Sequence, residues 1–230
     1  MKYPIILLDA DDTLLDFAAS EAAALGDTLA AFGLPDTPAV RRRYSDINVA
    51  HWKMLERGEI TRPQLKFSRF RVFLAELGSD ADPAACNAYY MERLGSYSIP
   101  LPGAEDLCRR LAEHHRLYIV TNGSTSVQHR RFAASSLMPY IQKAYISEEL
   151  GVQKPSSAYF DAVFADLGNP PREQVIIFGD SQTSDMLGGK TAGIATCWFN
   201  PKGKAPTGDW DYTVTRLEDF LPIVEEGSYD

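Results

Sequence analysis

Cysteine is scarce in this sequence, and the three that it has stand far apart. Cys86, Cys108 and Cys197 form no closely spaced pair. A small secreted fold held by disulfides needs a denser and even set, and a structural zinc site needs ligands at short spacing. We therefore expect three free thiols in a reducing compartment, with neither a disulfide framework nor a zinc site.

Long apolar runs and an excess of positive charge are also missing. No stretch approaches the roughly 20 consecutive apolar residues of a membrane-spanning helix. The apolar run that ends at Leu8 is short and leads straight into Asp9, Asp11 and Asp12, unlike a secretory signal. A formal net charge of -8 gives no basic surface for a polynucleotide or an anionic membrane. We expect a cytoplasmic protein whose partners include neither a nucleic-acid polymer nor a membrane.

What the sequence has is an ordinary globular composition and a regular alternation of two patterns. Apolar residues make up 45% and charged residues 23% of the 230 residues, as in most globular domains. Strands that alternate with helices predict an α/β fold, a Rossmann-like parallel sheet with helices on both faces. The strand-like apolar runs lie at 3–8, 117–120, 143–146, 175–178, 196–199 and 212–214, and the helical patterns between them at 104–114, 127–136, 157–167 and 184–192.

One segment interrupts this alternation. From about Phe17 to Ser96 no run is typical of a buried strand, and glycines and a proline separate four helical patterns instead. These helical patterns lie at 18–32, 39–57, 62–77 and 82–94. The sequence therefore predicts two domains. Residues 1–16 and 97–230 form a Rossmann-like catalytic core, and residues 17–96 form a helical cap inserted into it.

The first strand is followed directly by two carboxylates, Asp9 and Asp11. Side chains at i and i+2 leave an extended chain on the same side, so both can point at one reaction centre. The alternative is that these residues and Thr13 only cap a helix or a turn. The choice depends on the other motifs that follow the predicted strands.

Polar motifs also follow other predicted strands. Thr121 and Asn122, before Gly123, can hold a phosphate oxygen or simply form a turn. Lys154 precedes a proline, so it lies on a loop just before a helix, where a solvated surface charge is the alternative. Asp180 follows Gly179, which permits close backbone approach. Asp185 lies in the first turn of the next helix, where stabilising the helix dipole is the alternative role.

These motifs, in this order, resemble the signatures of the haloacid dehalogenase superfamily. Its signatures are DxDx(T/V), a Ser or Thr after the second strand, a Lys, and GDxxxxD, and all four match over essentially the whole chain. The inserted helical segment is similar to the small cap of one subgroup. The resemblance implies a magnesium-dependent phosphatase in which Asp9 is the nucleophile that takes a phosphoryl group from a small phosphomonoester.

The resemblance also implies the roles of the remaining motif residues. Mg²⁺ would be held by the carboxylates of Asp9 and Asp180 and by the backbone carbonyl of Asp11, with Asp185 just outside. Lys154 would balance the charge on Asp9 and on the phosphoryl group. The phosphoryl oxygens would be held by the Thr121 side chain and the Asn122 backbone.

Asp11 decides the type of reaction. As general acid it would protonate the leaving alkoxide, and as general base it would activate the water that cleaves the aspartyl-phosphate. A halide needs no proton on leaving, so a carboxylate at this position favours phosphoryl transfer over dehalogenation. A sugar-phosphate phosphatase or phosphomutase uses the same pair, and it stays an alternative. A non-enzymatic phospho-acceptor module would not explain the cap.

A narrower resemblance is to the bacterial pyrimidine 5'-nucleotidase branch of the superfamily. It is carried by the segments 14–17, 58–61 and 197–200 and by Trp52, Arg69 and Phe70. It implies a nucleoside 5'-monophosphate as substrate, with pyrimidines preferred, and Phe17, Trp52, Arg69 and Phe70 as candidate substrate contacts. The alternatives are core packing for the aromatic residues and a surface salt bridge for Arg69. The sequence leaves a monomer and a homodimer equally open.

Overall fold

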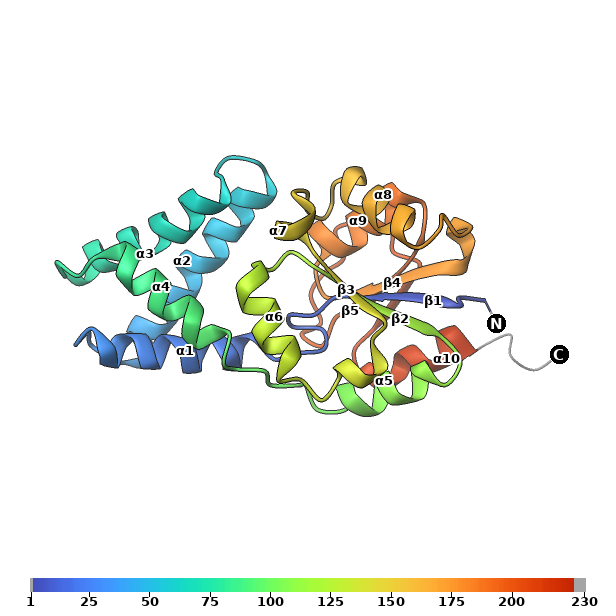
Figure 1. Ribbon diagram of the computed structural model, residues 1–230, viewed down its shortest axis with the longest axis horizontal. Helices are drawn as coiled ribbons and strands as arrows, with labels where there is room; N and C mark the ends of the chain where they lie inside the picture. The colour runs from blue at the N-terminus through green and yellow to red at the C-terminus, as the bar shows by residue number, and fades with distance from the viewer. Residues whose placement is uncertain (1, 226–230) are drawn as a thin grey trace. The chain divides into compact units, whose positions relative to one another are not determined.

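A computed structural model describes residues 2–225 of the chain. Within them a parallel sheet has the strand order β3-β2-β1-β4-β5-β6 (Figure 1). The strands are β1 (Ile5–Leu8), β2 (Arg116–Thr121), β3 (Lys143–Ile146), β4 (Val175–Gly179), β5 (Ala195–Phe199) and β6 (Tyr212–Val214). The predicted Rossmann-like α/β fold is confirmed.

Helices fill the intervals between the strands and the segment after β1. The α-helices are α1 (Phe17–Ala31), α2 (Pro38–Glu56), α3 (Arg62–Leu77), α4 (Pro83–Leu94), α5 (Ala104–Ala112), α6 (Thr125–Ala133), α7 (Ser147–Leu150), α8 (Ser157–Asp166), α9 (Leu187–Ala192) and α10 (Phe220–Glu225). Short 3₁₀ turns lie at Met138–Tyr140, Arg172–Gln174 and Leu217–Asp219, and a π-helical turn at Gln182–Met186.

The sheet is buried on both faces, as its continuous apolar strands predict. Alternate residues of β1 to β5 contribute to opposite cores. On one face Ile6 and Phe178 pack in a cluster with residues of α5 and α10, and the ring of Phe178 stacks on Phe220 with centroids 4.3 Å apart. On the other face Leu7 and Ile177 pack with the aromatic residues of α8. Figure 1 shows α8 and α9 on the side of the sheet opposite α5 and α10.

The strand order reverses at β1, which pairs with β2 on one side and with β4 on the other. Leu8, the last residue of β1, is in register with Ile119 of β2 and Phe178 of β4. Chains that leave these three carboxyl ends therefore emerge side by side. In open parallel sheets this switch point is where ligands bind.

The chain divides into two compact units. One comprises the chain up to Phe17 together with the chain from Ser98 onward, and the other comprises Ala18–Tyr97. The second unit is helical, and its core is aromatic, with Tyr44 and Phe70 each in ring contact with the other and with both Phe73 and Tyr90.

Local sequence explains where the helices of the second unit begin. Thr37, Thr61 and Asp82 each accept a hydrogen bond from a backbone N–H of the first turn, and a proline stands at N1 or N2 of each helix. Thr61 forms a capping box with Gln64. Gly78 ends α3 in the left-handed conformation, which glycine adopts without strain.

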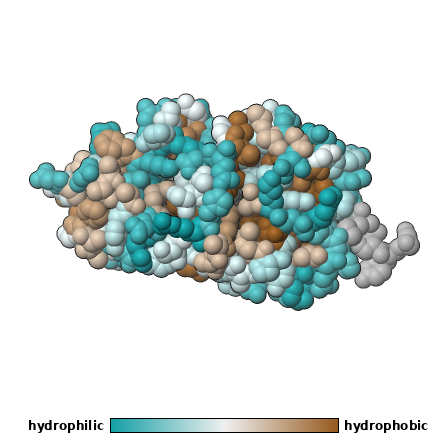
Figure 2. Space-filling model, viewed as in Figure 1, coloured by the Kyte–Doolittle hydropathy of each residue, from teal (hydrophilic) through white to brown (hydrophobic). Residues whose placement is uncertain are grey.

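The surface is mixed in polarity. On the face shown in Figure 2, hydrophilic residues are interspersed with apolar ones. The large apolar side chains that are exposed among the described residues are Val49, Phe67 and Leu187. None of the helices within residues 2–225 combines the length and the apolar character that crossing a bilayer requires.

His115 should make the stability of the core unit depend on pH. Its ring is buried, and its Nδ1 donates to the carbonyl of Tyr3 at 2.7 Å. Burial lowers the pKa of His115 below its ordinary value. The unfolded chain therefore takes up a proton at a higher pH than the folded chain. The contribution of His115 to the free energy of unfolding is fully present above the unfolded pKa of about 6.5, and it is lost as the pH falls below that value.

We expect His115→Gln to weaken this pH dependence. The free energy of unfolding of the unaltered protein should fall more steeply from about pH 7 to about pH 5.5 than that of the variant, measured by urea denaturation. His114→Gln is the matched control, because His114 is the exposed neighbour. Parallel stability profiles for the unaltered protein and His115→Gln would contradict this expectation.

Candidate active site

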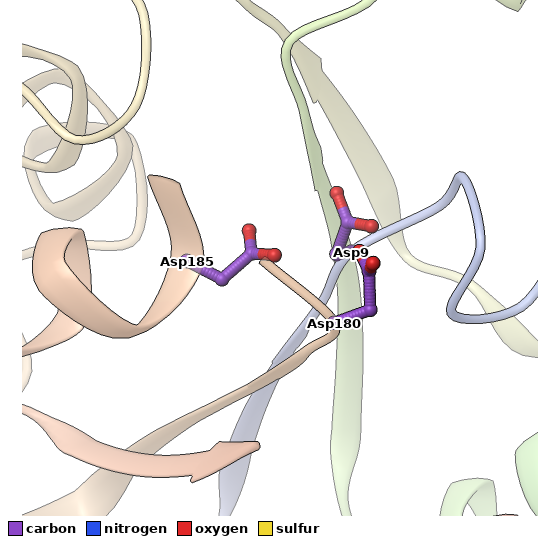
Figure 3. A group of neighbouring side chains, drawn as sticks. All are labelled: Asp9, Asp180 and Asp185. Carbon is purple, nitrogen blue, oxygen red and sulfur yellow. The ribbon is translucent and has the colours of Figure 1, made fainter. Parts of the chain in front are cut away.

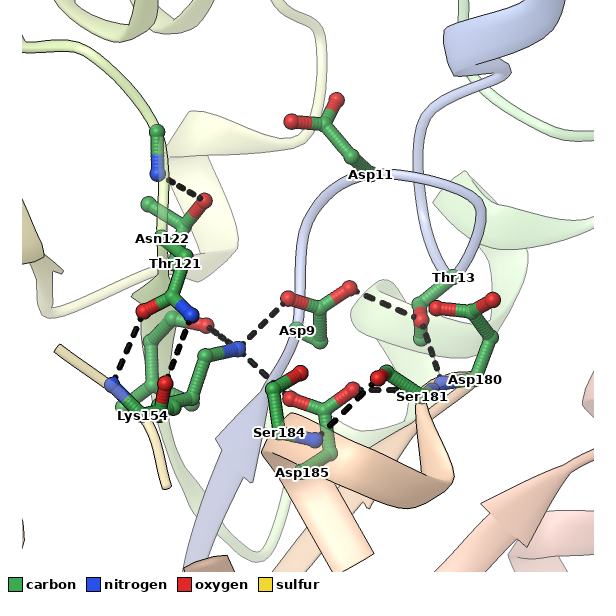
Figure 4. A network of polar contacts seen from close by, with 12 residues as sticks. Asp9, Asp11, Thr13, Thr121, Asn122, Lys154, Asp180, Ser181, Ser184 and Asp185 are labelled. Atoms are coloured by element: carbon green, nitrogen blue, oxygen red, sulfur yellow. Dashed lines mark hydrogen bonds and ion pairs between the residues drawn. The ribbon is translucent and has the colours of Figure 1, made fainter. Parts of the chain in front are cut away.

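Three strand ends and one loop place their polar side chains around a single point. Asp9 follows β1, Thr121 ends β2 and Asp180 follows β4. The backbone N–H of Asp9 still donates to the carbonyl of Phe178 at 2.9 Å, so the sheet continues to the carboxylate itself. Lys154 reaches the same point from the loop before α8. Figure 4 shows these residues converging.

Lys154 is the centre of the polar network. Its ammonium group donates to Oδ1 of Asp9 at 2.7 Å, to Oδ1 of Asp185 at 2.6 Å and to the carbonyl of Val120 at 2.7 Å. The Lys154 residue is only 1% exposed. All three ammonium hydrogens therefore have buried acceptors, which fixes both carboxylates relative to the sheet.

Asn122 holds the backbone of Lys154 in place. Its side-chain amide donates to the carbonyl of Lys154 and accepts from the N–H of Lys154, both at 2.9 Å. This two-sided bond ties the loop before α8 to the end of β2, although 32 residues separate the partners. The Asn122 side chain therefore positions the lysine, while the predicted phosphate contact from its backbone stays a prediction.

Thr13 links the ends of β1 and β4. Its hydroxyl donates to Oδ2 of Asp9 at 3.1 Å and accepts from the backbone N–H of Asp180 at 3.1 Å. The indole N–H of Trp198 donates to the carbonyl of Asp180 at 2.9 Å. Asp9 thus has one oxygen on Lys154 and the other on Thr13, and the backbone of Asp180 is held on both sides.

Asp185 reaches the site because the helix after β4 begins with a π-helical turn. The predicted single helix at 184–192 is wrong in this respect, since α9 starts only at Leu187. The N–H groups of Asp185 and Met186 both donate to the carbonyl of Ser181, at 3.0 and 3.1 Å. This wide turn presents the Asp185 carboxylate to Lys154 and to the N–H of Ser181 at 3.0 Å. π-Helical turns often occur at functional sites.

Gly179 is required by the same turn. A Cβ atom at this position would lie 2.4 Å from Oδ2 of Asp185. Only glycine lets the end of β4 pass so close to the carboxylate.

Asp9, Asp180 and Asp185 form an oxygen-rich group that suits a divalent cation. One carboxylate oxygen from each lies within 4.8 Å of the others (Figure 3). Burial and then like charge raise the pKa of Asp9 and of Asp180, although Lys154 opposes the shift at Asp9. Burial alone lowers the pKa of Lys154, but Asp185 and Asp9 outweigh it and the pKa is raised. One ammonium group, bonded to two of the three carboxylates, leaves an excess of negative charge on hard oxygen ligands, which fits Mg²⁺.

The Asp11 carboxylate does not join this group. Figure 4 shows it apart from the carboxylate of Asp9, and the expectation that both side chains aim at one reaction centre stays a prediction. The chain turns after Asp9 because Asp12 adopts φ 59 and its N–H donates to the carbonyl of Leu15. Asp11 instead accepts from two side chains of α6, Gln128 at 3.0 Å and Arg131.

The predicted substrate contacts lie in different surroundings. Arg69 is 2% exposed and donates to Asn48 and Asn87 within the helical unit, so the alternative of a surface salt bridge is wrong. Phe70 lies in the aromatic core of that unit, which agrees with the alternative of core packing. Trp52 is half-buried, with the guanidinium of Arg62 over its ring at 5.9 Å. Phe17, the first residue of α1, is half-buried in the core unit.

Sequence reasoning missed Gln128 and Arg131. Both are buried on the inner face of α6 beside Val127 and Phe132. A signal was present, because a glutamine and an arginine occupy positions i+1 and i+4 from Val127 on an otherwise apolar helix face. A long polar side chain on a buried face needs a partner.

Residues 3–193 match the model of the haloacid dehalogenase-like hydrolase family. The chain therefore belongs to this family and is a hydrolase, and the resemblance seen in its four motifs is confirmed.

The similar proteins also include the nucleotidase branch. Pyrimidine 5'-nucleotidase PynA of Streptococcus pneumoniae is 37% identical over 202 residues, which are 87% of this chain and 85% of PynA. Pyrimidine 5'-nucleotidase YjjG of Escherichia coli is 33% identical over 230 residues, which are 97% of this chain and 99% of YjjG. A crystal structure of the HAD-hydrolase YfnB of Bacillus subtilis bound to magnesium has a TM-score of 0.93 at 36% identity, covering 97% of this chain and 99% of that one.

Removing the lysine should destabilise the fold. In Lys154→Met two buried carboxylates lose their shared counter-charge, and the free energy of unfolding at neutral pH should fall by about 3–5 kcal/mol. Lys143→Met is the matched control, because the ammonium of Lys143 pairs with Asp166 on the surface and its loss should matter little. Chemical denaturation without added metal compares the two. Equal losses in both variants would contradict the central role of Lys154.

Proposed function

We propose that this chain is a magnesium-dependent phosphoric monoester hydrolase that forms an aspartyl-phosphate on Asp9. One observation carries the proposal. The Asp9 carboxylate stands at the end of the central strand, held by Lys154 on one oxygen and by Thr13 on the other, with Asp180 and Asp185 beside it. A fixed carboxylate next to a cation and further carboxylates is suited to attack on phosphorus, because the repulsion between two anions is offset by charge placed in advance.

In the first step, an oxygen of Asp9 attacks the phosphorus of the ester. The bond from phosphorus to the alcohol oxygen breaks, and Asp11 gives its proton to the departing alkoxide. In the second step Asp11 takes a proton from a water molecule, the water oxygen attacks the same phosphorus, and the carboxylate of Asp9 leaves. Lys154 offsets negative charge throughout, and Thr121 and the backbone of Asn122 hold phosphoryl oxygens.

We propose Asp9, Asp180 and the backbone carbonyl of Asp11 as ligands of Mg²⁺, with Asp185 holding the ion or its waters. The donor set is all oxygen, which suits a hard cation. When bound, the ion supplies positive charge to the phosphoryl oxygens. The excess of carboxylates over ammonium groups around Asp9 supports this assignment.

We propose nucleoside 5'-monophosphates as substrates, with pyrimidines preferred. The names of PynA and YjjG support this class, since both are similar to this chain over most of its length. The helical unit is proposed as the substrate-selecting cap, with Trp52 and Phe17 as contacts of the base. The same resemblance implies Arg69 and Phe70, which are buried in that unit, and we propose that they support the shape of the substrate-selecting surface.

We propose that the enzyme is cytoplasmic. Its three cysteines are free and buried, which accords with a cytoplasmic location. A net charge of -8 disfavours a polynucleotide as substrate. Both a monomer and a homodimer accommodate a site built within one chain.

Asp9→Asn should abolish phosphate release, because an amide is neither a useful nucleophile nor a good metal ligand. The matched control is Asp12→Asn in the same loop. The carboxylate of Asp12 is not part of the group of three, and asparagine tolerates its left-handed backbone. Steady-state release of phosphate from an aryl phosphate, with magnesium and with a chelator, measures both variants. Normal turnover by Asp9→Asn, or full activity after chelation, would contradict the proposal.

The substrate proposal gives an order of kcat/KM. UMP, dUMP and dTMP should exceed AMP, and all of them should exceed a sugar phosphate and a short oligonucleotide. Phosphate release from each compound, measured at matched magnesium, checks the order. If a sugar phosphate exceeded every nucleotide by more than about tenfold, or roughly 1.4 kcal/mol of transition-state stabilisation, the phosphatase would stand and the nucleotidase would fall.

A further inference from the structure

Helix α6 carries two buried polar side chains on the face that packs against the core. Gln128 is 1% exposed and Arg131 is 0% exposed. Neither is among the residues that the family signatures contain. Both are in contact with the Asp11 carboxylate, which accepts from Nε2 of Gln128 at 3.0 Å and from Nη1 of Arg131.

Arg131 fixes which way the amide of Gln128 faces. A guanidinium group only donates, so the atom of Gln128 that lies 3.1 Å from Nη1 of Arg131 is the carbonyl oxygen Oε1. The NH₂ group must then face the other way. Its two hydrogens point to Oδ2 of Asp11 and to Oγ1 of Thr121, each at 3.0 Å.

This amide in turn sets the direction of the Thr121 hydroxyl. Its oxygen accepts from Nε2 of Gln128 and from the backbone N–H of Gly123 at 3.2 Å. Two donated hydrogen bonds use both lone pairs, so the hydroxyl can only donate its own hydrogen elsewhere. Gly123 permits this packing, since a Cβ atom there would lie 2.4 Å from Cγ of Gln128.

We propose that Gln128 and Arg131 are positioning residues that align the two polar groups through which the reaction is proposed to act. They hold the carboxylate of Asp11 for transfer of a proton to the leaving group, and they turn the hydroxyl of Thr121 towards a phosphoryl oxygen. This inference rests on the proposed phosphatase function. It adds that a pair on α6 coordinates general acid–base catalysis with phosphate binding, since one amide contacts both groups.

A double-mutant cycle tests whether Arg131 acts through Asp11. Four proteins are compared: the unaltered enzyme, Arg131→Met, Asp11→Asn and the double variant. For each, kcat/KM is measured with an aryl phosphate, whose leaving group needs little protonation, and with an alkyl phosphate, whose leaving group needs much. We expect Arg131→Met to lose about 10²-fold on the alkyl phosphate and far less on the aryl phosphate. In the Asp11→Asn background the same substitution should have almost no further effect.

Gln128→Met is the second variant, because it keeps the volume of the side chain and removes its amide. It should lose activity on both esters through Thr121, and a larger factor on the alkyl phosphate through Asp11. Arg130→Met on the same helix is the matched control, since its side chain is exposed. It should leave kcat/KM unchanged on both substrates. Thermal unfolding of every variant shows whether it is folded. If Arg131→Met does not fold, the losses of Gln128→Met on the two esters test the inference by themselves.

Equal losses on the two esters, or losses by Arg131→Met and Asp11→Asn that multiply in the double variant, would overturn the inference while leaving the phosphatase intact. An unaltered enzyme that hydrolyses neither ester, or an active Asp9→Asn variant, would overturn the proposed function as well. The two failures are therefore distinguishable.

Discussion

The buried ammonium group of Lys154 holds two carboxylates that come from distant segments of the chain. Its bonds to Asp9 and Asp185 are 2.7 and 2.6 Å long, and both partners are buried. Without this charge the carboxylates would repel each other in a poorly solvated place. With it, Asp9 is anchored as a carboxylate at the end of the central strand, and the remaining negative charge faces the position proposed for the metal.

Other contacts in the core unit keep that arrangement in place. Asn122, which follows β2, binds the backbone of Lys154, and Thr13 joins Asp9 to the backbone of Asp180. Each link crosses between segments that are distant in sequence but adjacent at the switch point of the sheet. The parallel strand order, more than any single motif, brings these groups together, and the π-helical turn then directs Asp185 towards them.

The parts of the site that follow from local pattern were predictable from the sequence. Continuous apolar runs identify buried strands, and Asp9 and Asp180 are placed by the ends of those strands. The direction of the Asp11 side chain was not predictable, because it depends on partners contributed by α6 across the fold. Burial of Arg69 was missed for a similar reason, since its asparagine partners come from two other helices. The start of α9 was misplaced because helical periodicity does not reveal a π-helical turn.

The central claim is that Asp9 receives the phosphoryl group while Lys154 holds the Asp9 carboxylate in place. The most direct measurement is to quench the enzyme with acid during turnover of a phosphomonoester, to digest it at acidic pH, and to analyse the peptides by mass spectrometry. An acyl phosphate should be found on the peptide that contains Asp9, at a side chain that hydroxylamine converts to a hydroxamate. Turnover with an unmodified Asp9, or with the phosphoryl group on another residue, would contradict the account.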